Sequence, residues 1–249
     1  MGRLTGDMDS HLIGRGGFAF TGLRFDKLGA TEYTLVTVAV DVSGSVELFE
    51  KELLSAIKLA VDACKKSPRS DNILVRVLLF STKFQGGVSE LHGFKPLTDI
   101  DVAAYPALHP SGSTPLWDAV YSSIGATNIY AELLANQDYG VNAITFVITD
   151  GANNSSTATM AMIKHELKKA ISGEKLESMI SILVGINSAE CRTYLEEFQK
   201  EAGMTHYKDI GDATPRNLAK LAAFVSRSVS SQSQALGTGV PSKQIAATI

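Results

Sequence analysis

Two aspartates and three hydroxyl residues stand where the chain changes from apolar to polar. Asp41-Val42-Ser43-Gly44-Ser45 follows an apolar run, Thr114 lies just ahead of a helical pattern, and Asp150 follows a second apolar run. Carboxylate and hydroxyl oxygens are the ligands of hard cations, and Mg²⁺ takes them in near-octahedral geometry. No His or Cys lies in these segments, which argues against zinc or copper. The candidate metal ligands are therefore Asp41, Ser43, Ser45, Thr114 and Asp150.

A cation held in this way would bind an anionic group from outside. Few of its ligands carry charge, so the ion stays electrophilic, and an acidic group of a partner can complete its shell. A helix N-terminus just beyond Ser45 would add partial positive charge. We therefore expect Mg²⁺ or Mn²⁺ as cofactor, and a protein partner that offers an Asp or Glu.

Two alternatives in which these residues bind no metal remain open. Ser and Thr after a strand are ordinary helix caps, so Ser43 or Ser45 could cap one helix and Thr114 the next. The five residues could also be the remnant of a site that no longer binds metal.

The elements that must position these residues follow from the pattern of apolar residues. Non-alternating apolar runs indicate strands buried on both faces, at residues 34–40, 73–80, 143–148 and 179–186. Helical spacing occurs at residues 46–66, from 115 onward, and at 153–171, 189–201 and 215–228. Residues 85–97 indicate an antiparallel edge strand. This alternation predicts an α/β fold with a mostly parallel sheet and helices on both faces. Ligands gather at the carboxyl ends of such strands, so the three polar loops should meet at one rim.

The chain divides by composition into a domain with two arms. Residues 1–30 form a glycine-rich N-terminal arm in which Phe18, Phe20 and Phe25 could support a strand or hairpin. Residues 31–228 form the domain. Residues 229–249 form a Ser-, Gly- and Thr-rich C-terminal tail, a composition that usually cannot bury enough surface to become ordered.

The three polar segments together resemble a known motif. Asp41-Val42-Ser43-Gly44-Ser45, Thr114 and Asp150 match, in order and residue type, the metal-ion-dependent adhesion site of von Willebrand factor A (vWA) domains. The resemblance covers roughly residues 31–228. Ser-Thr-Pro-Leu-Trp-Asp-Ala and Ile-Thr-Asp-Gly look most like stand-alone bacterial vWA proteins of the tellurite-resistance type.

The resemblance implies a Rossmann-like fold and a role for each ligand. Ser43, Ser45 and Thr114 would bind the metal directly or nearly so, and Asp41 and Asp150 would often act through water. We therefore expect a non-enzymatic module that captures an acidic residue of a protein partner. An alternative is a structural or assembly subunit, with a homo-oligomer or larger complex held through the two arms. A weaker alternative is an adaptor for an AAA-type ATPase.

The sequence offers no group for catalysis. Residues 14–19 loosely fit a dinucleotide fingerprint, but no clear strand precedes them and no clear helix follows. Ser43 stands where aspartyl phosphatases carry a second Asp as general acid. We therefore do not expect an enzyme.

Composition excludes several further classes. The 249 residues carry a net charge of −3, which gives no electrostatic footprint for nucleic acid. Two cysteines, Cys64 and Cys191, cannot form a disulfide-rich scaffold, and Cys64 lies on the apolar stripe of its helix. No apolar run is long enough for a membrane helix, and the first residues lack the apolar core of a secretion signal. The expected location is the cytoplasm, with no membrane contact.

Overall fold

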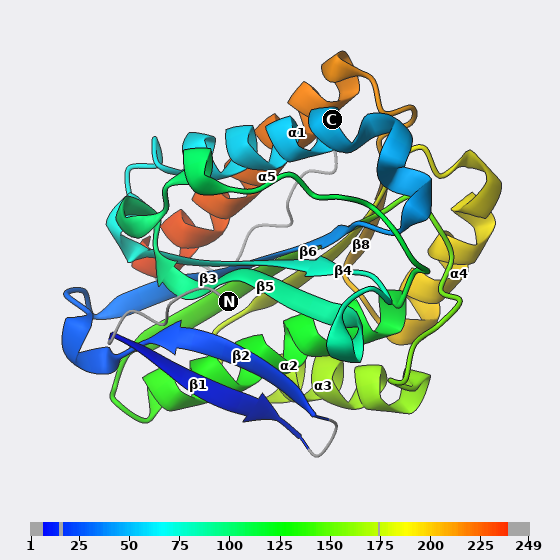
Figure 1. The fold of residues 1–249 in the computed structure, drawn as a ribbon. Coiled ribbons are helices and arrows are strands. Elements are labelled where there is room, and N and C mark those ends of the chain that lie inside the picture. The colour runs from blue at the N-terminus through cyan, green and yellow to red at the C-terminus, as the bar shows by residue number, and fades with distance from the viewer. Residues whose placement is uncertain (1–6, 15–16, 174, 239–249) are drawn as a thin grey trace.

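The computed structural model describes residues 7–14, 17–173 and 175–238, which form a central sheet between two layers of helices (Figure 1). In spatial order the strands are β1 (Met8–Ile13), β2 (Phe18–Leu23), β5 (Val88–Pro96), β4 (Ile73–Phe80), β3 (Glu32–Asp41), β6 (Gly140–Thr149), β7 (Met179–Gly185) and β8 (His206–Asp209). The helices are α1 (Glu50–Cys64), α2 (Leu116–Ala135), α3 (Met160–Ser172), α4 (Arg192–Ala202) and α5 (Pro215–Thr238).

The middle of the sheet is parallel. Strands β4, β3, β6, β7 and β8 run in the same direction, and β5 is antiparallel to β4. Every residue of β4 is buried, as is every residue of β3 and β6 except the first. Burial on both faces explains why these segments are uninterrupted apolar runs in the sequence. The predicted α/β class is confirmed.

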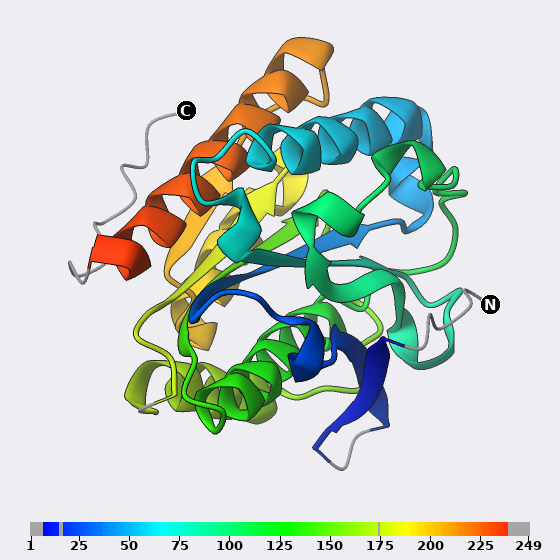
Figure 2. The same cartoon turned by 90° about the vertical axis from the view of Figure 1, so that its left-hand side faces the viewer.

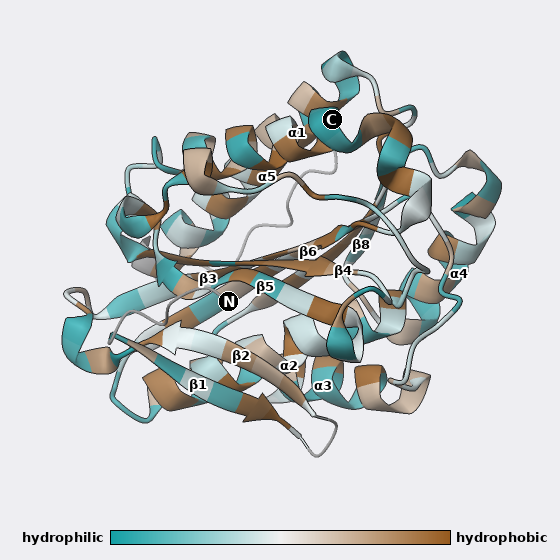
Figure 3. Cartoon of the chain, in the orientation of Figure 1, coloured by the Kyte–Doolittle hydropathy of each residue, from teal (hydrophilic) through white to brown (hydrophobic). Residues whose placement is uncertain are grey.

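Two hydrophobic cores lie on opposite faces of this sheet. Helices α1 and α5 pack together over one face, and α2, α3 and α4 cover the other (Figure 2). Hydropathy colouring shows the apolar residues concentrated along the central strands (Figure 3). Cys64 is buried in the core under α1, as its place on the apolar stripe predicts.

The N-terminal arm contains the hairpin that its phenylalanines could support. Strands β1 and β2 are antiparallel, and β2 adjoins β5 through a single residue pair, Gly22 with Phe94. Glycine is required at position 22, because a Cβ there would lie 2.5 Å from the Tyr130 ring of α2. Phe20 is buried in the same core as Tyr130, so the hairpin is part of the folded domain.

An ion pair between the buried Arg76 and the partly buried Glu90 connects the hairpin to the sheet. The Nε of Arg76, on β4, donates to the Oε1 of Glu90 on β5 over 2.6 Å, and the Arg76 side chain is fully buried. Glu90 also accepts hydrogen bonds from the backbone and hydroxyl of Thr21 on β2. The other end of the guanidinium donates to Ser122 of α2. This one ion pair therefore connects three strands and a helix.

The largest differences from the sequence prediction concern three helix boundaries. The segment expected to start the first helix forms the 3₁₀ helix η2 (Gly44–Phe49), and α1 begins only at Glu50. Helix α3 begins at Met160 rather than near residue 153, because the residues before it form a loop that contacts α2. Helix α5 continues past the predicted end at residue 228 to Thr238, because Val229 and Leu236 are buried against the domain.

Some segments of the sequence lie outside the described residues. These are residues 1–6 and 239–249 of the two arms, and residues 15–16 of the fingerprint-like segment. Gly14 and Gly17, on either side of the latter pair, adjoin β1 and β2 and have positive φ angles. The described part of the segment therefore belongs to a hairpin connection and does not open a helix.

Candidate metal centre

The three polar loops meet at the carboxyl ends of β3 and β6. Asp41 is the last residue of β3, and Asp150 directly follows β6. The backbone N–H of Gly44 donates to Gly112 O over 3.0 Å, and Ser111 N–H donates to Val42 O over 3.0 Å. These bonds join the loop after β3 to the loop before α2, as the parallel sheet predicts.

Hydroxyl and carboxylate groups from two of these loops form a connected chain. Ser43 Oγ lies 3.2 Å from Ser45 Oγ, and Ser45 Oγ donates to Asp150 Oδ1 over 2.9 Å. Asp41 accepts from Ser43 N–H at Oδ1 over 2.9 Å and from Thr149 Oγ1 at Oδ2 over 2.6 Å. Four of the five predicted ligands are thus linked, each to the next, by hydrogen bonds.

Thr114 comes to the same place from the third loop. Its side chain is buried, and its Oγ1 would lie 3.7 Å from a Cβ built on Gly151, the neighbour of Asp150. Its backbone is fixed by Asn154, whose Oδ1 accepts from Thr114 N–H over 2.8 Å and whose N–H donates to Thr114 O. Within the described part of the chain we find no hydrogen bond of the Thr114 hydroxyl. That hydroxyl oxygen is therefore available to a further ligand beside Gly151.

These hydroxyls do not cap helices, so the alternative in which they act only as caps is wrong. Ser43 precedes η2, but its side chain makes no capping hydrogen bond, and α1 begins after Phe49. Helix α2 is preceded by Pro115, not capped by Thr114. The N–H group of Trp117, in its first turn, instead donates to another loop, to Ser156 Oγ at 3.0 Å and Asn153 Oδ1 at 3.3 Å. The three hydroxyls are therefore not needed to cap the N-terminus of a helix.

A buried aspartate outside the predicted set fixes the loop that follows Asp150. Asp118, in the first turn of α2, is 1% exposed. Its carboxylate accepts from Ala158 N–H over 2.6 Å, and from the N–H and hydroxyl of Thr157 over 2.9 and 3.1 Å. This clamp holds the Asp150 loop against the helix that follows Thr114. Asp118 is thus a positioning residue that the sequence analysis missed.

The loop before α2 is held from its other side by the segment after β4. Gly112 has a φ of +79°, and a Cβ there would lie 2.7 Å from Thr82 Oγ1, so glycine is required. Ser113 N–H donates to Thr82 Oγ1 over 2.8 Å, and Ser81 Oγ donates to Ser111 O. Glu50 of α1 accepts from two further N–H groups of this loop, those of Leu108 and His109. The loop is therefore fixed in place independently of any ion.

Burial governs the electrostatics of the centre. Asp41 is 1% exposed, and loss of water raises its pKa from 3.8 to about 7 although Thr149 and Ser43 hydrogen-bond to it. Burial likewise raises the pKa of Asp150, against the hydrogen bond from Ser45. A cation bound beside these two desolvated carboxylates would favour the ionised form of both.

The donor set fits a hard cation. In residues 7–14, 17–173 and 175–238, no group of three or more His, Cys, Asp or Glu side chains gathers. An ion at this rim would therefore be held by two carboxylates and by hydroxyl oxygens, ligands that suit Mg²⁺ or Mn²⁺ better than Zn²⁺ or Cu²⁺.

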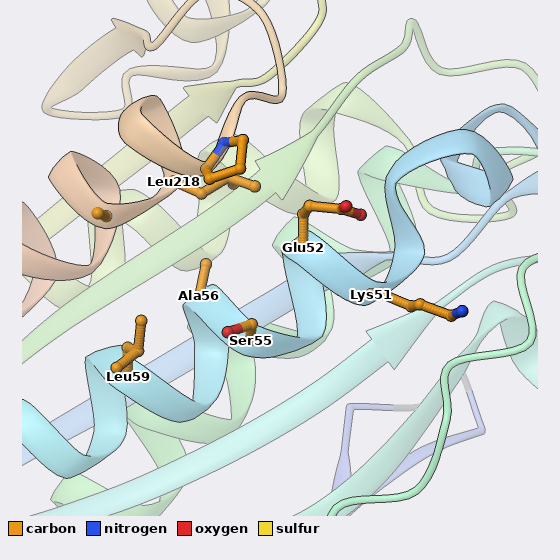
Figure 4. Close-up of a pocket in the computed structure, with 8 residues that line it drawn as sticks. Lys51, Glu52, Ser55, Ala56, Leu59 and Leu218 are labelled. Atoms are coloured by element: carbon orange, nitrogen blue, oxygen red, sulfur yellow. The ribbon is translucent and has the colours of Figure 1, made fainter.

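Two neighbouring features lie outside this centre. Trp117 is partly buried, donates from Nε1 to the Tyr194 hydroxyl over 3.1 Å and stacks on Phe198, so it joins α2 to α4. A groove between α1 and α5 is lined by residues that include Ala56, Leu59 and Leu218 (Figure 4). None of the five candidate ligands lines it.

Comparisons with known proteins identify the fold. No family model and no curated relative matches the chain. Among solved structures, the pilus adhesin SpaC from Lactobacillus rhamnosus GG is similar with a TM-score of 0.61 and 12% identity, over 90% of this chain and 33% of that one. Proximal thread matrix protein 1 from the mussel byssus is similar with a TM-score of 0.55 and 20% identity, over 80% of this chain and 48% of that one.

The chain thus spans about a third to a half of the length of these proteins. No helix in the described ranges is both long and apolar enough to cross a membrane. At these identities the likeness concerns the fold alone, and together with the sheet order it shows a Rossmann-like, vWA-like α/β architecture.

Proposed function

We propose that this chain is a non-enzymatic protein-binding module that holds Mg²⁺ or Mn²⁺ and uses it to capture an Asp or Glu of a protein partner. The observation that carries the proposal is the chain of hydrogen bonds from Ser43 through Ser45 to Asp150, with the Thr114 hydroxyl beside Gly151, the next residue in the chain. The residues that would hold the ion are Asp41, Ser43, Ser45, Thr114 and Asp150.

The balance of charge favours an anionic partner group. Asp41 and Asp150 together supply two negative charges, and hydroxyl ligands supply none. When bound, the ion supplies a positive centre with a position for one more oxygen ligand. The protein's own groups would hold and orient it, since Asp41 accepts a hydrogen bond from the Ser43 N–H and the Thr114 N–H donates to Asn154 Oδ1.

The surface beside the centre suits contact with a protein. Ser45, Ser111, Gly112 and Ser113 are exposed. Leu48, three residues beyond Ser45 in η2, is 93% exposed, and an apolar side chain so open to water is a natural anchor for a partner. We propose that the partner's acidic residue is bound by the ion while a neighbouring apolar residue packs on Leu48.

Direct binding of Mn²⁺ tests the metal site. We expect calorimetric titration of the full chain with Mn²⁺ to give one site. Thr114→Ala should weaken it at least about tenfold, because the third loop then loses its candidate ligand hydroxyl. Thr98→Ala, which alters an exposed threonine away from the rim, is the matched control and should bind as the parent does. Equal binding by Thr114→Ala and the parent, or no binding by the parent, would overturn the metal site.

Capture of acidic peptides tests the use of the ion. Two displayed peptide libraries are compared, one with Asp at a fixed position and one with Asn there. The chain should capture more of the Asp library than of the Asn library, and only when Mg²⁺ is present. Chelator should abolish the preference, and Leu48→Ser should weaken capture without changing Mn²⁺ affinity. Capture that survives chelator unchanged would refute the proposed role of the ion.

A further inference from the structure

Strand β1 ends the sheet with one side unpaired. In the described part of the chain it pairs with β2 alone, and Figures 1 and 2 show it at the outer margin of the hairpin. Arg24 N–H donates to Asp7 O, so odd-numbered residues of this strand direct their backbone groups toward β2. The backbone groups of Met8, Ser10 and Leu12 therefore point outward, away from the sheet.

The two ends of the sheet differ in how they are protected. Natural edge strands are usually blunted by short length, lysine or proline. Strand β8 has four residues, one of them Lys208. Strand β1 has six residues, Met-Asp-Ser-His-Leu-Ile, without lysine or proline, and Leu12 on it is 72% exposed. Among the described residues, the β1 edge is therefore longer than the β8 edge and lacks its lysine.

The sequence of β1 is complementary to itself. In an antiparallel pair related by a twofold axis at Ser10, Met8 of one chain faces Leu12 of the other, and Asp9 faces His11. Residues 8, 10 and 12, whose backbone N–H and C=O groups point away from β2, would form the hydrogen-bonded pairs of this register. Asp9 and His11 would form the close, non-hydrogen-bonded pair of the ladder, in which the carboxylate can accept a hydrogen bond from the imidazole N–H.

We propose that β1 is the interface with a second copy of this chain, paired antiparallel about Ser10 so that two sheets continue into one. The twofold register places apolar pairs on one face and two acid–imidazole pairs on the other, without any change to the hairpin. His11 already lies stacked on Phe20, with ring centroids 5.0 Å apart, so its ring is oriented before association. This interface does not depend on the metal centre.

Sedimentation of the full chain over micromolar to millimolar concentrations tests the association. A six-residue strand buries less surface than a standard interface of about 1,600 Å², so we expect a weak dimer whose population rises with concentration. Ser10→Pro removes one outward N–H without touching the bonds to β2, and should leave a folded monomer of 26.6 kDa. Ser10→Ala keeps that N–H and should dimerise like the parent.

Charge exchange tests the register. Asp9→His alone and His11→Asp alone place like groups opposite each other, and each should weaken the dimer several-fold. The double variant Asp9→His with His11→Asp restores both pairs and should associate better than either single variant. Thermal melting of all three in dilute solution shows whether the monomer remains folded.

Crosslinking locates the twofold axis. In a Cys191→Ser background, Ser10→Cys should form an intermolecular disulfide, because the two Cα atoms of a hydrogen-bonded pair lie about 5.5 Å apart. Leu12→Cys faces Met8 in this register and should not crosslink. A parent that stays monomeric, a Ser10→Pro variant that still dimerises, or crosslinking of Leu12→Cys instead of Ser10→Cys would each overturn the proposal.

Discussion

Asp41 carries a carboxylate that the fold has almost removed from water. It is 1% exposed, and burial raises its pKa from 3.8 to about 7. The hydrogen bonds from Thr149 and Ser43 favour the ionised form but do not compensate for the lost water. Without a cation, this side chain is therefore partly protonated at neutral pH, and a bound cation would favour its ionised form.

The free energy of unfolding in chelator should depend on pH through this residue. The pKa of Asp41 is higher in the folded state than in the unfolded state, so protonation of Asp41 stabilises the folded state. That contribution is complete below pH 3.8 and is lost as the pH rises through about 7. The amide of the Asp41→Asn variant does not ionise, so at pH 8 this variant should be about 2–4 kcal/mol more stable than the parent. Urea unfolding at pH 5 and pH 8 measures this, and a difference that does not shrink at pH 5 would contradict it.

Asp118 should matter for stability more than any exposed acid. Asp118→Ala leaves the N–H groups of Thr157 and Ala158 without their buried acceptor, which should lower the free energy of unfolding by about 3 kcal/mol. It should also weaken Mn²⁺ binding, since the Asp150 loop loses its clamp. Asp71→Ala, at an exposed position, is the matched control for urea unfolding. Equal stability of the two variants would show that the clamp is dispensable.

The sequence predicts the five candidate ligands because each follows a strand or precedes a helix within its own segment. It does not predict Asp118, Asn153 or Ser156, because their partners lie 36 to 40 residues away along the chain. Polar loop residues carry no periodicity that tells which neighbour they will meet. The sequence shows only that Asp118 lies in the first turn of a helix. That position is equally typical of an acid that stabilises the helix N-terminus and of one that binds a neighbouring loop.

At the scale of elements, helix α5 shows where composition misleads. Its last turns contain Ser, Gln and Gly, which predict a tail, yet Ser233 is fully buried and Val229 and Leu236 lie in the interior. Gln232 Nε2 donates to Ala143 O over 3.3 Å and to Ser178 Oγ over 2.7 Å, while Asn142 Nδ2 donates to Gln232 O. Small side chains permit close packing on β6, a tertiary effect that no local propensity reveals.

Removing these contacts should destabilise the whole fold. Gln232→Ala should lower the free energy of unfolding by about 1–2 kcal/mol, because two hydrogen bonds to the sheet region are lost. Truncation after Ser228 should cost more, since buried Val229 and Leu236 go as well. Lys220→Ala, on the exposed side of α5, is the control in thermal melting. If the truncated chain has the same melting temperature as the parent, these last turns contribute nothing to stability.

At the scale of the whole molecule, the metal centre joins loops from distant parts of the sequence. Asp41, Thr114 and Asp150 follow or precede three different elements, so an ion shared by them would bind only the folded chain. Ligands that bind only the folded state stabilise it by mass action. The parallel sheet that creates this rim was predictable from buried apolar runs. The order of its strands and the short strand β8 were not predicted, and the four residues of β8 are mostly polar.

Magnesium should therefore raise the melting temperature of the parent. At a concentration of about 100 times Kd the stabilisation is about 2.7 kcal/mol, or about 5–10 °C for a domain of this size. At the same Mg²⁺ concentration a tenfold weaker Thr114→Ala variant gains about 1.4 kcal/mol, so its shift should be about half that of the parent or less. Differential scanning calorimetry with and without Mg²⁺ measures it, and an equal shift in both proteins would mean that the ion binds elsewhere.

The hairpin of β1 and β2 has a consequence for the order of folding. Thr21 and Glu90, which hold it to the sheet, are 69 residues apart, and only one backbone pair joins β2 to β5. Closing so long a loop costs entropy before the contact is made, so docking of the hairpin should follow formation of the central strands. Pulse-labelling by hydrogen exchange during refolding should protect amides of β3 and β4 before those of β2. The β1 edge proposed to bind a second copy should therefore dock onto the sheet only after the central strands have formed.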